Sequence, residues 1–145
     1  MILYLDTSAL VKKYFKEPGS AEVISRWKEA KGIVTSSVAY AETLASFYRK
    51  KREVTISSRM FGTILGSFRR DWRSFIRVEV SDDLNETIDK IIDKYPLRGF
   101  DAIHLASALM IDETMPESLL FACHDEKLIL AAQKAGLQTL PERPE

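Results

Sequence analysis

The sequence predicts an α/β fold, with a parallel sheet covered by helices on both faces in three layers. Short apolar runs of strand length alternate with longer helical patterns along the whole chain, which is typical of parallel strands joined by right-handed crossovers. The chain has 145 residues, 46% of them hydrophobic, which is enough for one compact core and short for two. We therefore expect a single domain spanning residues 1–145.

Charge is balanced over the whole chain but not along it. Lys+Arg and Asp+Glu both number 21, so net charge favours neither nucleic acid nor membrane as a ligand. Residues 49–77 hold nine Lys and Arg residues and two acids, a net charge of +7 that the remainder balances with −7. A basic surface and an acidic site can therefore coexist.

Cysteine content and apolar run lengths indicate where the protein works. Cys123 is the only cysteine, so an internal disulfide is excluded, and its apolar neighbours predict a small buried residue. The first residues lack the pattern of a signal peptide, and no apolar run reaches membrane-spanning length. We expect a cytoplasmic protein that does not bind membranes.

The first strand is residues 1–5, an apolar run that ends abruptly at Asp6. Thr7 or Ser8 can cap the helix that follows, and its pattern continues to about Lys16, before a proline–glycine pair. An acid directly after a parallel strand lies at the edge of the sheet where ligands bind. The alternative is that Asp6 is only a helix N-cap.

A second helix presents Val23, Ile24 and Trp27 on one face, and residues 33–35 form the second strand. The third helix runs from Val38 to about Lys51 and has an acid on its apolar stripe.

Helical spacing places Glu42 among the stripe residues Val38, Ala41, Ala45 and Tyr48. A carboxylate buried without a partner is costly, so a metal ion or a basic group is implied. The alternative is that Glu42 lies at the edge of the stripe, near solvent.

The fourth helix, residues 56–75, is strongly amphipathic. Its apolar side consists of Phe61, Ile64, Leu65, Phe68, Trp72 and Phe75. Gly62 and Gly66 would let another helix approach closely, and we expect packing within the domain rather than a dimer contact. Arg69 and Arg73 lie near the opposite face, where they either contact phosphates or form an ordinary solvated surface.

Residues 76–80 alternate apolar and charged side chains, which predicts an edge strand. A helix starts at residues 81–83 and ends at Pro96. The next helix opens with Asp101 and is apolar nearly all round, so it should be central and buried. His104 on this helix is either a catalytic base or, as is commoner, a histidine hydrogen-bonded to structure.

The last elements are a strand at residues 119–124, a helix at 126–135 and a short strand at 138–140. Asp125 directly follows the first of these strands. The carboxyl ends of parallel strands share one edge of the sheet, so we expect four acids to converge there.

These acids are Asp6, Glu42, Asp101 and Asp125. Four like charges in one cleft repel strongly, and a divalent cation resolves the conflict. Oxygen ligands without a cysteine or a histidine pair favour Mg²⁺ or Mn²⁺, and Mg²⁺ completes its shell with water and phosphate. The predicted chemistry is attack on a phosphodiester.

Four motifs hold these acids in a characteristic order. They are Leu5-Asp6-Thr7-Ser8-Ala9-Leu10, Ala41-Glu42, Phe100-Asp101-Ala102-Ile103-His104-Leu105-Ala106 and His124-Asp125-Glu126-Lys127-Leu128, followed by Ala132 and Gly136-Leu137. Together they resemble the motifs of the PIN domain, and most closely those of the VapC-type toxin ribonucleases. The resemblance spans essentially the whole chain.

The resemblance implies a PIN-like α/β/α domain of strand order 3-2-1-4-5, a homodimer, and cleavage of single-stranded RNA with Mg²⁺ or Mn²⁺. It assigns the four acids as the catalytic, metal-binding quartet and Thr7 or Ser8 as the associated hydroxyl. Cys123 stands where the family usually has Thr or Ser. The implied partner is a small antitoxin protein that inserts basic and apolar residues into the acidic groove.

We therefore expect a metal-dependent endoribonuclease acting on single-stranded or structured RNA, the toxin of a toxin–antitoxin pair. Asp6, Asp101 and Glu42 would bind the ion, and Asp125 would bind a second ion or orient the attacking water.

Residues proposed to support the quartet or contact the substrate are Thr7, Ser8, His104, Arg69 and Arg73. One alternative is a catalytically silent PIN-like module that binds RNA or protein. Another is an aspartyl-phosphate phosphatase, which would need an Asp in place of Ser8.

Overall fold

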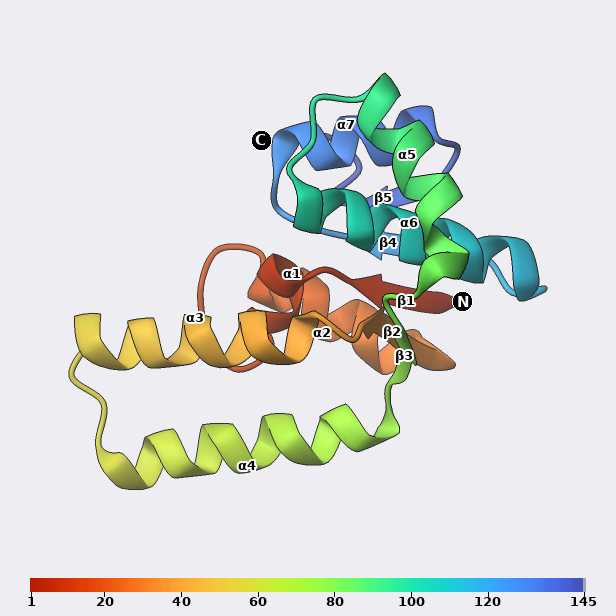
Figure 1. Cartoon of the computed structure of the whole chain (residues 1–145). Coiled ribbons are helices and arrows are strands. Elements are labelled where there is room, and N and C mark those ends of the chain that lie inside the picture. The colour runs from red at the N-terminus through yellow and green to blue at the C-terminus, as the bar shows by residue number, and fades with distance from the viewer. Residues whose placement is uncertain (145) are drawn as a thin grey trace.

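A computed structural model describes residues 1–144 and contains one five-stranded sheet (Figure 1). All four neighbouring strand pairs are parallel, in the order β3-β2-β1-β4-β5. The strands are β1 (Ile2–Leu5), β2 (Gly32–Ser36), β3 (Ile76–Val78), β4 (Leu119–Ala122) and β5 (Gln138–Leu140). The predicted fold class and strand order are confirmed.

β1 is the central strand, because it pairs with β2 on one side and β4 on the other. Tyr4 lies beside Val34 of β2 and Phe121 of β4. All four residues of β1 are buried. A strand covered on both faces is apolar throughout rather than alternating, which explains the uninterrupted apolar run at the start of the sequence.

Helices cover both faces of the sheet. One layer contains α1 (Thr7–Val11), α2 (Ser20–Glu29), α3 (Ala39–Glu53) and α4 (Ser58–Ser74). The other contains a 3₁₀ turn, η1 (Asp82–Leu84), with α5 (Asn85–Lys94), α6 (Gly99–Thr114) and α7 (Glu126–Lys134). None of the helices in the described part of the chain is long and apolar enough to cross a membrane.

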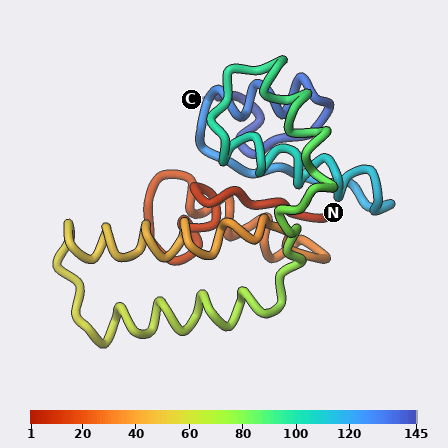
Figure 2. The backbone as a smooth tube through the Cα atoms, viewed as in Figure 1, coloured from red at the N-terminus to blue at the C-terminus, as the bar shows by residue number. Residues whose placement is uncertain are grey.

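Each layer has its own core. Ile2 and Tyr4 pack with the core under α5, α6 and α7, whereas Leu3 and Leu5 pack with the core under α1 to α4. This alternation follows from the pleat, which points successive side chains to opposite faces. The trace in Figure 2 shows α3 running on past the sheet and α4 returning beside it, so that the two helices form a projecting hairpin.

The prediction of which face of α3 is buried is wrong. Ala41, Ala45 and Tyr48 are exposed, and the buried face consists of Ala39, Thr43, Ser46 and Phe47. The ring of Phe47 packs on Phe68 of α4, with 5.5 Å between centroids. The long aromatic side chain, rather than the small apolar ones, decides which face is turned inward.

Two further expectations for this layer are corrected. Gly62 and Gly66 face open space, since a Cβ at either position would meet nothing within 4 Å, so they do not mediate close packing within the domain. α1 ends at Val11 rather than near Lys16, because the following residues form turns that carry Tyr14 onto Phe68.

Two strands are also shorter than expected. β3 ends at Val78 instead of residue 80, and β4 ends at Ala122 instead of residue 124. Asp125 accordingly follows a short loop rather than the strand itself.

Truncation of Phe68 tests the core under α4. Phe68 is fully buried, so Phe68→Ala should lower the free energy of unfolding by about 3 to 5 kcal/mol. Phe100→Ala removes the same atoms from a residue that is 56% exposed and should cost less than about 1 kcal/mol. Chemical denaturation followed by circular dichroism measures both, and equal losses would contradict the packing described.

Candidate active site

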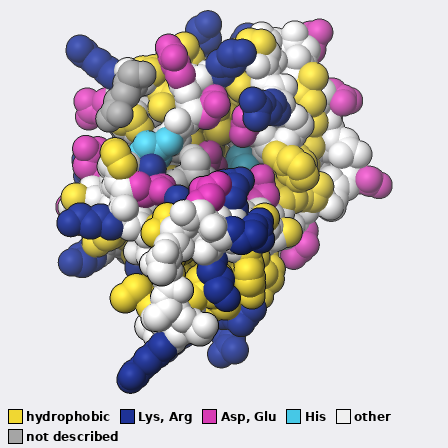
Figure 3. All heavy atoms as spheres, turned by 90° about the vertical axis from the view of Figure 1, so that its left-hand side faces the viewer, with side chains coloured by type: hydrophobic (Ala, Val, Ile, Leu, Met, Phe, Trp, Pro, Cys, Tyr) yellow, Lys and Arg dark blue, Asp and Glu magenta, His cyan; other side chains and the backbone are white. Residues whose placement is uncertain are grey.

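A cleft of about 960 Å³ lies beyond the carboxyl ends of the central strands. All four predicted acids line it, and they come from four separate segments: Asp6 after β1, Glu42 on α3, Asp101 on α6 and Asp125 before α7. Figure 3 looks at the end of the molecule from which the α3–α4 hairpin projects, and shows acidic side chains around a hollow with basic ones beside them. The topology therefore brings together residues spread over most of the sequence.

Asp6 is both a helix N-cap and a member of the cleft, so the two interpretations of this residue are compatible. Its Oδ1 accepts hydrogen bonds from the Ala9 N–H at 2.9 Å and the Ser8 hydroxyl at 2.7 Å. Both bonds go to one oxygen, which leaves Oδ2 for a ligand. Burial raises the pKa of Asp6 to about 6.

Ser8 connects two motifs that are far apart in the sequence. While its hydroxyl donates to Asp6, its Oγ accepts the backbone N–H of His124 at 3.0 Å. Cys123 is fully buried, as expected, and burial raises the pKa of its thiol. Ser8 thus joins the Asp6 carboxylate to the loop that leads to Asp125.

Glu42 lies at the edge of the buried face of α3, with its side chain 29% exposed. Its Oε1 accepts the Thr7 hydroxyl at 2.7 Å and lies 3.0 Å from His104 Nε2. Burial alone would raise the pKa of Glu42, but the hydrogen bonds from His104 and Thr7 lower it overall. Glu42 therefore has the partners that the sequence required for a partly buried carboxylate.

The ring of His104 is hydrogen-bonded on both sides, to Tyr4 and to Glu42. It is 2% exposed, and its Nδ1 lies 2.8 Å from the Tyr4 hydroxyl. A neutral ring that donates from Nε2 to Glu42 and accepts at Nδ1 from Tyr4 satisfies both contacts. The imidazole thus holds the Glu42 carboxylate in place at the lining of the cleft.

Asp101 and Asp125 complete the acidic side of the cleft. Asp101 is in the first turn of α6, and Asp125 caps α7 by accepting the Leu128 N–H at 2.9 Å. Burial, and to a smaller extent the charge of Asp125, raises the pKa of Asp101. The two carboxylates are therefore close enough to repel each other.

The donor set fits a hard divalent cation. The four acids, with the hydroxyls of Thr7 and Ser8, supply oxygen donors to the cleft, and positive charge bound between the carboxylates would relieve their mutual repulsion. Among residues 1–144, no three or more His, Cys, Asp and Glu side chains lie close enough together to hold a metal ion as they stand. An ion that keeps several waters and uses one or two carboxylates, as Mg²⁺ does, fits such an open arrangement better than zinc.

Arg69 and Arg73 do not line the cleft. Both are exposed on α4, and Arg69 Nε donates to the Tyr40 hydroxyl at 3.4 Å. The cationic residues that do line the cleft are Lys12, Arg49, Lys50 and Arg98. Sequence reasoning could have found two of them, because Arg49 and Lys50 follow Glu42 at helical spacing and so share its side of α3.

The model of the PIN domain matches residues 3–127 of this chain. The chain belongs to the PIN domain family. This agrees with the strand order and with the position of the four acids at the carboxyl edge of the sheet.

Other proteins and solved structures match this chain over most of its length. It is 29% identical to Ribonuclease VapC45 of Mycobacterium tuberculosis, over 97% of this chain and 95% of that protein. A structure of M. tuberculosis VapC20, described as a sarcin-ricin loop cleaving toxin, superposes with a TM-score of 0.61 and 16% identity, covering 93% of this chain and 95% of the other. A structure of a toxin–antitoxin complex from Klebsiella pneumoniae superposes with a TM-score of 0.61 and 18% identity, covering 86% of this chain and 88% of the matched chain.

The raised pKa of Asp6 predicts how stability depends on pH without metal. Between the ordinary value of 3.8 and about 6, the folded PIN domain holds a proton that the unfolded chain has released. The free energy of unfolding should therefore fall, by up to about 3 kcal/mol, as the pH rises through this window.

Asp6→Asn keeps an oxygen for Ser8 and Ala9 but cannot ionise. The free energy of unfolding of this variant, minus that of the unmodified protein, should grow from about pH 4 to about pH 6 and then stay constant. Urea denaturation in chelator across this pH range measures the difference, and a difference independent of pH would contradict the burial of a charged Asp6.

Proposed function

We propose that this chain is a Mg²⁺- or Mn²⁺-dependent endoribonuclease of the VapC type. The observation that carries the proposal is the gathering of Asp6, Glu42, Asp101 and Asp125 in one cleft of a PIN domain. The name of the relative Ribonuclease VapC45 and the description of VapC20 as a sarcin-ricin loop cleaving toxin support RNA as the substrate.

The four acids divide the work of hydrolysis. Asp6, Asp101 and Glu42 would hold the ion, and Asp125 would hold a second ion or orient the attacking water. The bound ion supplies Lewis-acid activation of water and offsets the charge that develops on the phosphate oxygens. Cleavage of the P–O3′ bond would leave a 5′-phosphate.

The surrounding residues keep this geometry in place. Thr7 and His104 fix one oxygen of Glu42, and Ser8 with the Ala9 N–H fixes one oxygen of Asp6. The carboxylates of Glu42 and Asp6 are thus oriented by protein bonds before an ion or substrate arrives, which reduces the cost of binding either.

The partner we propose is a small antitoxin protein, supported by the likeness to the Klebsiella toxin–antitoxin complex. A cleft rich in carboxylates is electrostatically suited to basic side chains of such a protein. Cytoplasmic action on single-stranded or structured RNA, and a homodimeric state, complete the proposal.

The two alternative functions are less well supported. A phosphatase that forms an aspartyl-phosphate would need an acid at position 8, whereas the hydroxyl of Ser8 is already bonded to Asp6 and His124. A module that only binds RNA or protein, without catalysis, would not require four carboxylates to be held together against their mutual repulsion.

Removal of one acid should abolish cleavage. Asp6→Asn or Asp101→Asn should lower the rate of RNA cleavage by about a hundredfold or more, because the ion loses a ligand. The measurement is gel analysis of single-stranded RNA oligonucleotides and a sarcin-ricin hairpin with Mn²⁺, with and without chelator.

The matched control is Asp93→Asn, the same change on the exposed side of α5 outside the cleft, which should leave the rate unaltered. Activity that survives both chelator and Asp6→Asn would rule out the proposed mechanism.

A further inference from the structure

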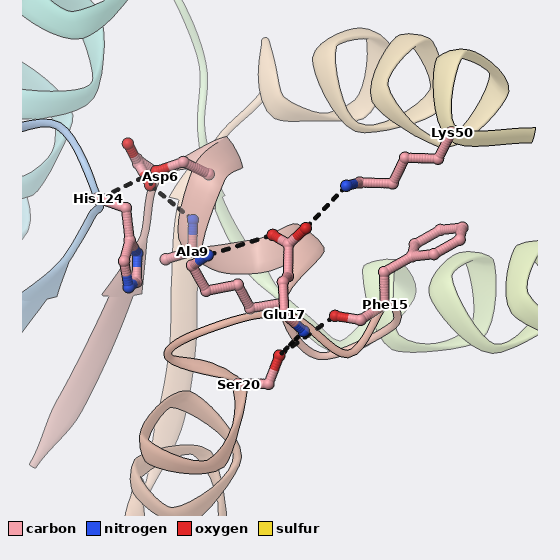
Figure 4. A network of polar contacts seen from close by, with 9 residues as sticks. Asp6, Ala9, Phe15, Glu17, Ser20, Lys50 and His124 are labelled. Carbon is pink, nitrogen blue, oxygen red and sulfur yellow. Dashed lines mark hydrogen bonds and ion pairs between the residues drawn. The ribbon is translucent and has the colours of Figure 1, made fainter. Parts of the chain in front are cut away.

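One wall of the cleft carries three charged side chains that the acidic quartet does not use: Lys12, Glu17 and Lys50. Lys50 Nζ lies 2.7 Å from Glu17 Oε2 (Figure 4). Lys12 Nζ lies 3.2 Å from Glu17 Oε1. One carboxylate therefore serves two ammonium groups. This two-lysine cluster has a net charge of +1.

The cluster is held in a fixed position. Glu17 is in the segment between α1 and α2, where its backbone N–H donates to Ser20 Oγ at 3.0 Å and Ser20 donates in turn to the Phe15 carbonyl at 3.2 Å. Gly19 has a φ of 96°, and a Cβ there would stand 2.6 Å from His124 Nε2. The segment is thus seated against the loop that leads to Asp125.

The two lysines are partly removed from solvent. The side chain of Lys12 is 10% exposed and that of Lys50 is 25% exposed. Burial alone would raise the pKa of Glu17, but hydrogen bonds from Lys50 and Lys12 lower it overall, so the carboxylate stays ionised. Shielded charges interact more strongly with an anion than charges on an open surface.

The position of the cluster matches the chemistry of a polynucleotide. Lys12 and Lys50 line the same cleft as Asp6 and Glu42. A strand with one phosphate at the acids brings its next phosphates along the cleft wall, where they need positive charge. The cluster supplies such positive charge, because the carboxylate of Glu17 neutralises only one of the two lysines.

We propose that Lys12 and Lys50 bind an RNA phosphate next to the one that is cleaved, and that Glu17 positions both lysines while limiting the strength of this contact. The inference rests on the proposed ribonuclease function and names residues that bind its substrate. It replaces Arg69 and Arg73, which lie outside the cleft, as the phosphate-binding residues.

Charge-changing variants separate this role from that of a structural ion pair. Lys50→Gln should raise the KM for a short fluorescent single-stranded RNA about tenfold, with kcat nearly unchanged, and make KM less dependent on salt. Glu17→Gln frees both lysines and should lower KM and steepen its salt dependence. Lys51→Gln, one residue away and outside the cleft, is the matched control.

A neutral methylphosphonate placed at single positions of the RNA locates the contact. At one position beside the cleaved bond it should raise KM for the unmodified protein but not further for Lys50→Gln. Thermal denaturation of each variant confirms that folded protein is compared.

If the unmodified protein cleaves RNA but KM rises in Glu17→Gln, or stays unchanged in Lys50→Gln, the cluster is a structural or protein-binding feature and this inference is overturned. If the unmodified protein cleaves no RNA, the ribonuclease proposal and this inference fail together.

Discussion

The repulsion between carboxylates at one edge of the sheet is the constraint on which the site depends. Parallel strands all end at the same edge, so Asp6 and Asp125 are brought there by the topology itself. The fold stabilises each of them locally, because Asp6 caps α1 and Asp125 caps α7 with a backbone N–H bond. These caps hold the acids in place but do not cancel their charge, which is why the cleft suits a cation.

Hydrogen bonds from neighbouring side chains also hold the acids in position despite their repulsion. The contacts of Glu42 with Thr7 and His104 join α3 to β1 through the Tyr4 hydroxyl. Ser8 joins the end of β1 to the loop before α7. Asp6, Glu42 and the loop before Asp125 are therefore linked by hydrogen bonds to the central strand β1 or to the residues that directly follow it.

Sequence reasoning identified the elements and the acids because strong local patterns encode them. The apolar run before Asp6 and the buried helix after Asp101 have few other interpretations. It failed on the face of α3, since Ala41 and Ala45 are apolar by type but too small to decide which side is buried, and Phe47 decided instead. It also considered Arg69 and Arg73 for contact with phosphates, and neither lines the cleft, because the position of α4 relative to the cleft depends on the path of the α3–α4 hairpin.

The central place of β1 has a consequence for the order of synthesis. Ile2, near the start of the chain, pairs with Leu119, and His124 bonds to Ser8. While a ribosome is still translating the middle of the chain, β1 lacks its neighbour β4, and Asp125 has not yet been synthesised. The cleft that gathers the four acids is therefore completed only after residues 119–125 have been synthesised and have paired with the first strand.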